Sequence, residues 1–170
     1  YLVLTKENLR LGIICLCGQL LMPPCNNPFT TLKEFIQTHF AQGMDQASFF
    51  PLPHPVILDF HTETTSEKRA MGWFADGKLS AVIGTHTHIQ TADEEILPLG
   101  TAYITDVGMT GSHNSVIGVK KEIAVEKFCT CVPKRFESSA SGLQINAVLL
   151  ELNSETGVAE SITRIKRSMD

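Results

Sequence analysis

Residues 56–88, VILDFHTETTSEKRAMGWFADGKLSAVIGTHTH, decide the fold. Residues 56–60 and 79–84 are apolar runs of strand length. Between them, SEKRAMGWF predicts a short helix that ends near the turn at Asp76 and Gly77. Thr64 and Glu67 have the spacing of a capping box at the start of this helix. The alternation of strand and helix predicts an α/β fold, in which helices pack on a mixed sheet.

The flanking segments extend this arrangement. Residues 1–18 predict a hairpin with its turn at residues 6–8, and residues 143–167 predict a second one. Apolar positions at helical spacing predict an amphipathic helix over residues 29–43. Residues 101–108 form a third apolar run, and residues 120–128 predict a further helix. The sequence contains no evident linker or repeat, so we expect one α/β domain over residues 1–170, with mixed β-sheets flanked by helices.

The composition is typical of a globular protein and excludes some functions. The chain has 170 residues, 43% of them hydrophobic, and a formal net charge of −4. Such a chain lacks the basic surface that binds the phosphate backbone of duplex nucleic acid, but this composition does not exclude a small phosphorylated ligand. The apolar run from Leu11 to Leu16 is far shorter than the roughly 20 residues of a membrane span. We therefore expect no membrane association and a cytoplasmic location.

The five cysteines do not suggest a disulfide framework, because their number is odd. Cys15 with Cys17 and Cys129 with Cys131 form two C-x-C pairs, whereas structural zinc sites usually use C-x2-4-C. Cys15 lies in an apolar run that reads as a buried strand. We expect it to act there as a small apolar core residue rather than as a zinc ligand.

Three histidines follow predicted strands. His61 comes directly after residues 56–60, and His86 and His88 come after residues 79–84. Ligands of open α/β sheets bind at the carboxyl ends of the strands, so these residues are expected in one crevice. Imidazole binds zinc, manganese and iron, and a His-x-His pair in an extended loop suits two neighbouring metals. An incidental pair remains the alternative.

Several other residues are weaker candidates. Asp59 and Glu63 lie close to His61 in the sequence and could orient a ligand histidine, although Asp59 could equally satisfy backbone donors at a strand end. Asp106 is a similar candidate. The turn at residues 108–111, GMTG, could present amides to an anion, but reads more readily as an ordinary loop. Surface positions are expected for the remaining histidines, which are His39, His54 and His113.

Three stretches together resemble a known family. DFHTETTSEK (59–68), VIGTHTHIQTAD (82–93) and LPLGTAYITDVGMTG (97–111) are similar to the YmdB-like branch of the calcineurin-type metallophosphoesterases. The likeness runs in order through most of the chain. It implies a four-layer α/β sandwich that hydrolyses phosphodiesters such as 2′,3′-cyclic nucleotides, with a hydroxide activated by two metals.

The resemblance also assigns the site residues. His61 and His86 match ligands of one metal and His88 matches a ligand of the other, so two divalent transition metals (Mn, Fe or Zn) are expected. The family's other ligands are an aspartate, a Glu-Asn pair and an Asn-His pair that carries the general acid. They belong to an N-terminal portion that we expect this chain to lack, so that neither a Glu-Asn nor an Asn-His pair is expected here, which would make the chain a poor catalyst alone. A homo-oligomer is implied as well.

Two further hypotheses compete with a phosphodiesterase. A noncatalytic nucleotide-binding or regulatory remnant of the same fold would keep the sheet and the glycine turn without the chemistry. A single-metal oxygenase could also use a His-x-His pair with a carboxylate. The alternation of strands and helices argues against the oxygenase, because that chemistry usually occurs in an all-β barrel.

Overall fold

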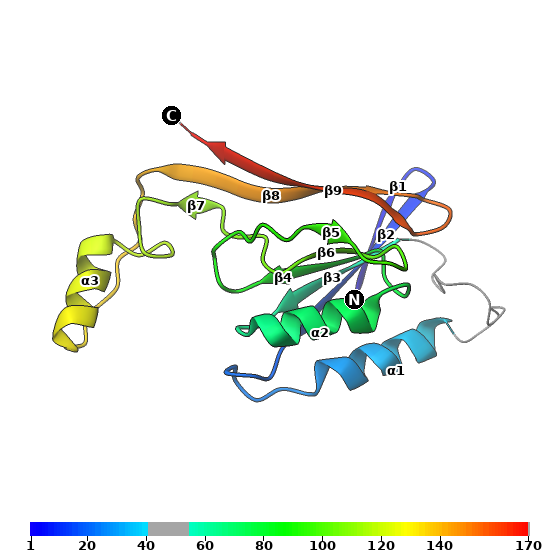
Figure 1. Cartoon of the computed structure of the whole chain (residues 1–170), viewed down its shortest axis with the longest axis horizontal. Helices are drawn as coiled ribbons and strands as arrows, with labels where there is room; N and C mark the ends of the chain where they lie inside the picture. The colour runs from blue at the N-terminus through cyan, green and yellow to red at the C-terminus, as the bar shows by residue number, and fades with distance from the viewer. Residues whose placement is uncertain (41–54, 170) are drawn as a thin grey trace.

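The computed structural model describes residues 1–40 and 55–169, and Figure 1 shows a large sheet with helices on one face and a second sheet on the other. Within these residues, the larger sheet has six strands in the order β1-β2-β3-β4-β6-β5. The four central strands run parallel, and each edge strand is antiparallel to its neighbour. The strands are β1 (Leu2–Lys6), β2 (Leu9–Cys17), β3 (Val56–His61), β4 (Ala81–Thr85), β5 (Glu95–Ile96) and β6 (Ala102–Ile104). The predicted mixed sheet is confirmed.

Helices α1 (Pro28–Phe40) and α2 (Thr65–Ala75) cover one face of this sheet (Figure 1). The core on this side contains Leu58 and Phe60 of β3 together with Leu32 of α1 and Met71 of α2. Each large apolar side chain buried here stabilises the fold by about 1.5–3 kcal/mol. Gly72 brings α2 close to the sheet, because a Cβ there would lie 2.6 Å from the ring of Tyr103.

The second sheet packs on the opposite face. It consists of β7 (Gly111–Ser112), β8 (Leu143–Leu152) and β9 (Ala159–Ser168), in that order. Ile83 of β4 and Ile104 of β6 form a second core cluster against Val148 of β8 and Ile162 of β9. The described residues therefore form three layers, helices, sheet and sheet, and the α/β class is confirmed. The fourth layer of the expected sandwich remains a prediction.

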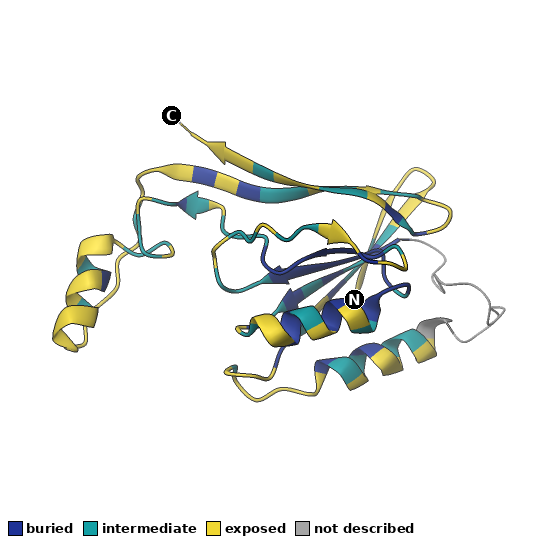
Figure 2. Ribbon diagram, in the orientation of Figure 1, coloured by how far each residue is buried: buried dark blue, intermediate teal, exposed yellow. Residues whose placement is uncertain are grey.

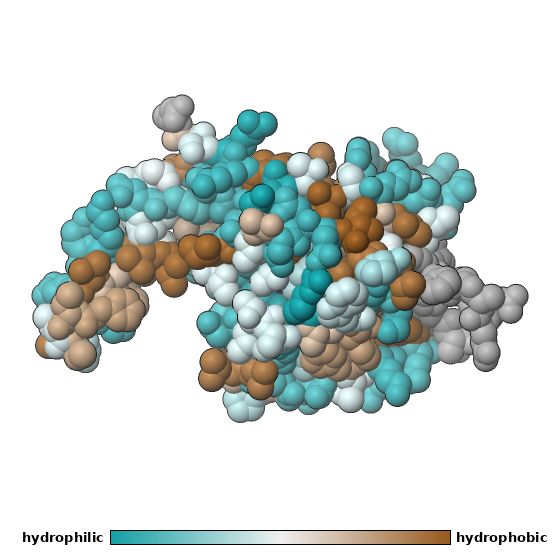
Figure 3. Space-filling model, in the orientation of Figure 1, coloured by the Kyte–Doolittle hydropathy of each residue, from teal (hydrophilic) through white to brown (hydrophobic). Residues whose placement is uncertain are grey.

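Helix α3 (Lys121–Thr130) lies away from these layers, at the end of an arm that leaves the second sheet (Figure 1). Figure 2 shows that most of its surface is exposed. The side chain of Phe128 is 75% exposed, and Val125, Val132 and Phe136 are also exposed. Figure 3 shows hydrophobic residues gathered on this arm.

Most predicted elements occur in the structure. The hairpins β1–β2 and β8–β9 have their turns where the sequence places them. Helix α1 is present up to Phe40, whereas the expected stop at Gly43 and the expected surface position of His54 lie outside the described residues. Two short strands, β5 and β7, were not predicted. Among the described helices, none combines the length and the apolar character that crossing a bilayer requires.

Two local predictions are wrong. Thr64 precedes α2 but makes no side-chain cap bond, and Glu67 instead accepts hydrogen bonds from the amides of Gln19 and Leu20. The capping box fails because distant amides compete for the carboxylate. Cys15 and Cys17 are exposed rather than buried, since they lie on the half of the sheet face that the second sheet does not cover. All five cysteines are free thiols.

Candidate metal centre

His61 and His86 meet because they end neighbouring parallel strands. His61 is the last residue of β3 and pairs in register with Thr85, the last residue of β4, so that His86 follows directly beside it. The Nε2 atom of His61 lies 3.0 Å from Nδ1 of His86, and the rings meet edge to face. Two nitrogens bound to one tetrahedral metal at about 2.0–2.1 Å are about 3.4 Å apart, so this pair is within a few tenths of an ångström of that spacing.

A carboxylate holds the far side of His86. Its Nε2 atom lies 2.9 Å from Oε2 of Glu63, and both side chains are partly exposed. An ionised carboxylate can only accept, so the hydrogen-bond network places the hydrogen of a neutral His86 ring on Nε2. The lone pair of Nδ1 then points at His61. A histidine whose second nitrogen donates to a carboxylate is the usual arrangement of a metal ligand.

The far side of His61 contacts a hydroxyl. Its Nδ1 atom lies 3.0 Å from Oγ1 of Thr85, and this hydroxyl donates to Oδ1 of Asp59 at 2.8 Å. Asp59 is also within 3.8 Å of the thiol of Cys15. Of the two carboxylates near His61 in the sequence, Glu63 therefore contacts His86 directly, whereas Asp59 reaches His61 through Thr85.

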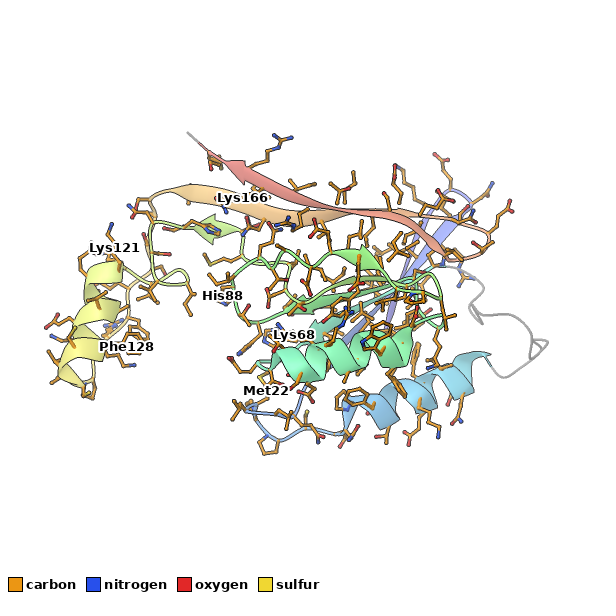
Figure 4. The ribbon with its side chains drawn as sticks, viewed as in Figure 1. Met22, Lys68, His88, Lys121, Phe128 and Lys166 are labelled. Atoms are coloured by element: carbon orange, nitrogen blue, oxygen red, sulfur yellow. The ribbon has the colours of Figure 1, made fainter. Side chains whose placement is uncertain are left out.

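His88 is placed separately from the other two histidines. Its Nδ1 atom donates to the carbonyl of Ile117 at 3.0 Å, which leaves Nε2 available. Figure 4 shows His88 at the same end of the sheet as Lys68, on the side nearer to α3. In residues 1–40 and 55–169, no three histidine, cysteine or acidic side chains are grouped closely enough to hold a metal ion. The structure thus joins two of the three predicted ligands and leaves the third apart.

The loop that carries His86 and His88 adopts an unusual backbone conformation. His86 has φ 110° and His88 has φ 67°, a region that residues other than glycine seldom occupy. Each such residue costs on the order of 1–3 kcal/mol, and such strain is found mainly at functional sites. Gly84 precedes the pair, where an added Cβ would lie 1.7 Å from the carbonyl oxygen of Thr105.

A buried ion pair holds this loop in place. Lys68 of α2 donates from Nζ to Oδ2 of Asp106 at 2.6 Å, and both side chains are only 1% exposed. The same carboxylate oxygen accepts from the amide of Thr87 at 2.9 Å, between the two loop histidines. Burial by itself would raise the pKa of Asp106, but the hydrogen bonds from Lys68, Thr87 and Gly108 hold the pKa below its usual range.

Sequence reasoning missed Lys68, although a signal was present. Lys68 shares the spacing of the buried positions Met71, Gly72 and Ala75, which is one face of a helix. A lysine on such a face needs a buried partner, and Asp106 supplies it. The GMTG turn is also explained in part, because the amide of Gly108 donates to Asp106 and is therefore not free for an anion.

The remaining candidates lie elsewhere. His113 is partly buried, with Nε2 3.0 Å from the carbonyl oxygen of Met109. The expectation that the chain contains no Glu-Asn pair is wrong, because Glu7-Asn8 is such a dipeptide, but it forms the turn between β1 and β2. The ends of β2 and β3 that carry Cys17 and His61 are paired with each other, at the opposite end of β2 from that turn. Glu7-Asn8 is therefore not part of the histidine site.

Comparisons with known proteins identify the family of the chain and similar folds. The chain is 41% identical over 156 residues to a 2′,3′-cyclic-nucleotide 2′-phosphodiesterase of Bacillus subtilis, which covers 92% of this chain and 55% of that protein. A hypothetical protein from Thermus thermophilus superposes with a TM-score of 0.82 at 32% identity, covering 99% of this chain and 62% of that one. A novel phosphatase from Mycoplasma pneumoniae gives 0.83 at 36% identity, covering 98% and 56%.

The chain therefore spans between about half and three fifths of the length of these relatives. The family match itself extends over residues 1–165, which includes all of the larger sheet, the second sheet except the last three residues of β9, all three described helices and the three histidines. On this match and on the shared fold, the chain belongs to the YmdB-like protein family.

Proposed function

We propose that this chain forms the histidine-bearing part of a phosphodiesterase that hydrolyses small phosphoesters such as 2′,3′-cyclic nucleotides. The observation that carries the proposal is the pair of ring nitrogens of His61 and His86, 3.0 Å apart, with Glu63 on the outer side of His86. This is a typical arrangement of two ligands prepared for one metal. The name of the Bacillus subtilis relative supports the choice of substrate class.

His61 and His86 would hold one divalent transition metal, and His88 would contribute to a second. Manganese, iron or zinc at these positions would supply Lewis-acid polarisation of the phosphoester and a hydroxide nucleophile at neutral pH. The residues of this chain orient the site: Glu63 fixes the ring of His86, while Lys68 and Asp106 fix the loop backbone at Thr87. No general acid is assigned among the described residues.

A noncatalytic nucleotide-binding module is the second candidate. It is favoured by the absence of a three-residue metal group within the described part of the chain. Two dications held by three neutral imidazoles would also lack the carboxylate charge that such sites normally provide. This reading predicts nucleotide binding that does not respond to a chelator.

Metal content per chain distinguishes the two candidates. We would measure it by inductively coupled plasma mass spectrometry in the wild-type chain, in His86→Ala/His88→Ala and in the control His113→Ala. The proposal expects manganese, iron or zinc in the wild type and in the control, lost in the double variant. With added Mn²⁺, hydrolysis of a 2′,3′-cyclic nucleotide should occur in the wild type and in His113→Ala and should be lost in the double variant. A folded wild-type chain that holds no metal, even after incubation with Mn²⁺, would contradict the proposal.

A further inference from the structure

We infer that Asp59 and Thr85 are positioning residues that set the tautomer of His61, with its hydrogen on Nδ1 and with Nε2 bare toward His86. The inference rests on the proposed function only in the use that it gives to the bare nitrogen. Its alternative is an ordinary hydrogen bond, in which Nε2–H of His61 would donate to Nδ1 of His86. The two cases have identical heavy-atom positions, so the hydrogen bonds around them must decide.

The hydroxyl of Thr85 carries one hydrogen, and the geometry assigns that hydrogen to Asp59. Oγ1 of Thr85 lies 2.8 Å from Oδ1 of Asp59, and an ionised carboxylate can only accept. The contact between Oγ1 and Nδ1 of His61, at 3.0 Å, then needs its hydrogen from the ring. Nδ1 is therefore the protonated nitrogen of a neutral His61, and Nε2 keeps its lone pair.

The same hydrogen bonds keep the two lone pairs facing each other. The outer partner of each ring is an acceptor, Glu63 for His86 and the Thr85 oxygen for His61, and both draw the ring hydrogens outward. Two facing lone pairs at 3.0 Å repel unless a cation lies between or beside them. A metal ligand whose second nitrogen is held in this way is oriented and more basic, and loss of such a partner typically lowers metal affinity about 10–100-fold.

Register places Asp59 and Thr85 for this role. Asp59 pairs with Ile83 and His61 with Thr85 in the parallel β3–β4 ladder, so all of them project from one face of the sheet. Asp59, His61 and Thr85 therefore all lie on two adjacent central strands of the sheet and not on a loop. The strand register places these three side chains close together without any contribution from a metal.

The test reads the tautomer directly. Long-range ¹H–¹⁵N spectra of the metal-free chain, labelled with ¹⁵N-histidine and recorded at mildly alkaline pH, report which ring nitrogen carries hydrogen, because the two tautomers carry it on different nitrogens. His61→Gln assigns the signals of His61. Thr85→Val removes the hydroxyl at nearly constant shape, Thr85→Ser keeps it, and Thr87→Val removes a neighbouring hydroxyl that touches neither ring.

We expect Nδ1–H for His61 in the wild type, in Thr85→Ser and in Thr87→Val, and a shift toward Nε2–H in Thr85→Val. A wild-type chain with Nε2–H, or a folded Thr85→Val chain that keeps Nδ1–H, would overturn the inference. Titration with Mn²⁺ tests the proposed function separately. If neither the wild type nor any variant binds Mn²⁺ while the tautomers are as expected, the metal-dependent function is rejected and the role of Asp59 and Thr85 is retained.

Discussion

Helices α2 and α3 have nearly the same length and very different surroundings. α2 buries five residues, Glu67, Lys68, Met71, Gly72 and Ala75, against the large sheet. Of the ten residues of α3, all of them described, Ala124 alone is buried. Isolated helices this short are marginal in water, so packing must supply most of the stability of α2. The buried Lys68 of α2 also reaches the histidine loop through Asp106, and the residues of α3 make no such contact.

Removing the buried lysine of α2 should give the largest effect. Lys68→Met leaves the carboxylate of Asp106 buried and unpaired, which should cost about 3–5 kcal/mol in the free energy of unfolding. Urea denaturation followed by circular dichroism measures it. Lys127→Met on α3 is the matched control, and should cost less than about 1 kcal/mol because Lys127 only overlies the ring of Phe136. Equal losses in the two variants would remove the distinction between the helices.

The second largest effect on stability is expected at Glu67, the residue that was predicted to form a capping box. Glu67 accepts from the amides of Gln19 and Leu20 and from the hydroxyl of Thr62, at 2.9, 3.3 and 2.6 Å. Glu67→Gln replaces one acceptor oxygen by a donor and should destabilise the fold by about 1–3 kcal/mol. Glu126→Gln removes the exposed ion pair with Lys134 and should change stability by no more than about 1 kcal/mol. Thermal unfolding of both variants gives the comparison.

Salt and acid should separate two lysine–carboxylate pairs. Lys120 lowers the pKa of the exposed Glu137, and the buried Asp106 also has a lowered pKa despite the opposing effect of burial. A carboxyl group whose pKa is lowered by folding stabilises the native state at any pH above its unfolded pKa. The contribution of Asp106 is therefore lost as the pH falls below the unfolded pKa of an aspartate and through the lower native pKa. Carboxyl ¹³C titrations at low salt and near 1 M salt should show the pKa of Glu137 rising with salt while that of Asp106 hardly moves.

The smallest effect is expected at the exposed face of α3. Phe128→Ala should change the free energy of unfolding by less than about 0.5 kcal/mol, because the side chain is 75% exposed. Sedimentation of the wild type and of Phe128→Ala at several concentrations compares their oligomeric states, and so shows whether the predicted homo-oligomer involves this face. A loss above about 1 kcal/mol that grows with protein concentration would mean that Phe128 is covered by another copy in solution.

The order of elements was predictable, because apolar periodicity and turn residues are local signals. The α/β class, both hairpins and all three described helices follow from them. What failed depended on distant partners: the amides of Gln19 and Leu20 lie more than forty residues from Glu67, and no spacing rule anticipates them. The exposure of Cys15 depends on how far the second sheet extends, which the sequence of β2 does not contain.

The site was predictable to a similar degree. His61 and His86 meet because parallel strands end at one edge, which strand order implies. The distinct roles of Asp59 and Glu63 were not predictable, because they depend on which ring each carboxylate reaches. The metal-ligand roles of His61, His86 and His88, and the identity of the metals, remain predictions.

Gly84 constrains the sequences of homologues for a purely structural reason. Any side chain there would collide with the backbone at Thr105, directly after β6, so the constraint is imposed by the sheet and is independent of catalysis. Under the proposed function, a descendant that had lost the activity would still keep this glycine, while selection would no longer maintain Glu63. Homologues that keep Gly84 but lack an acidic residue at position 63 are therefore candidates for proteins that have lost the activity. In a mutational scan that selects only for folding, we expect substitutions of Glu63 to be accepted and every substitution of Gly84 to be rejected.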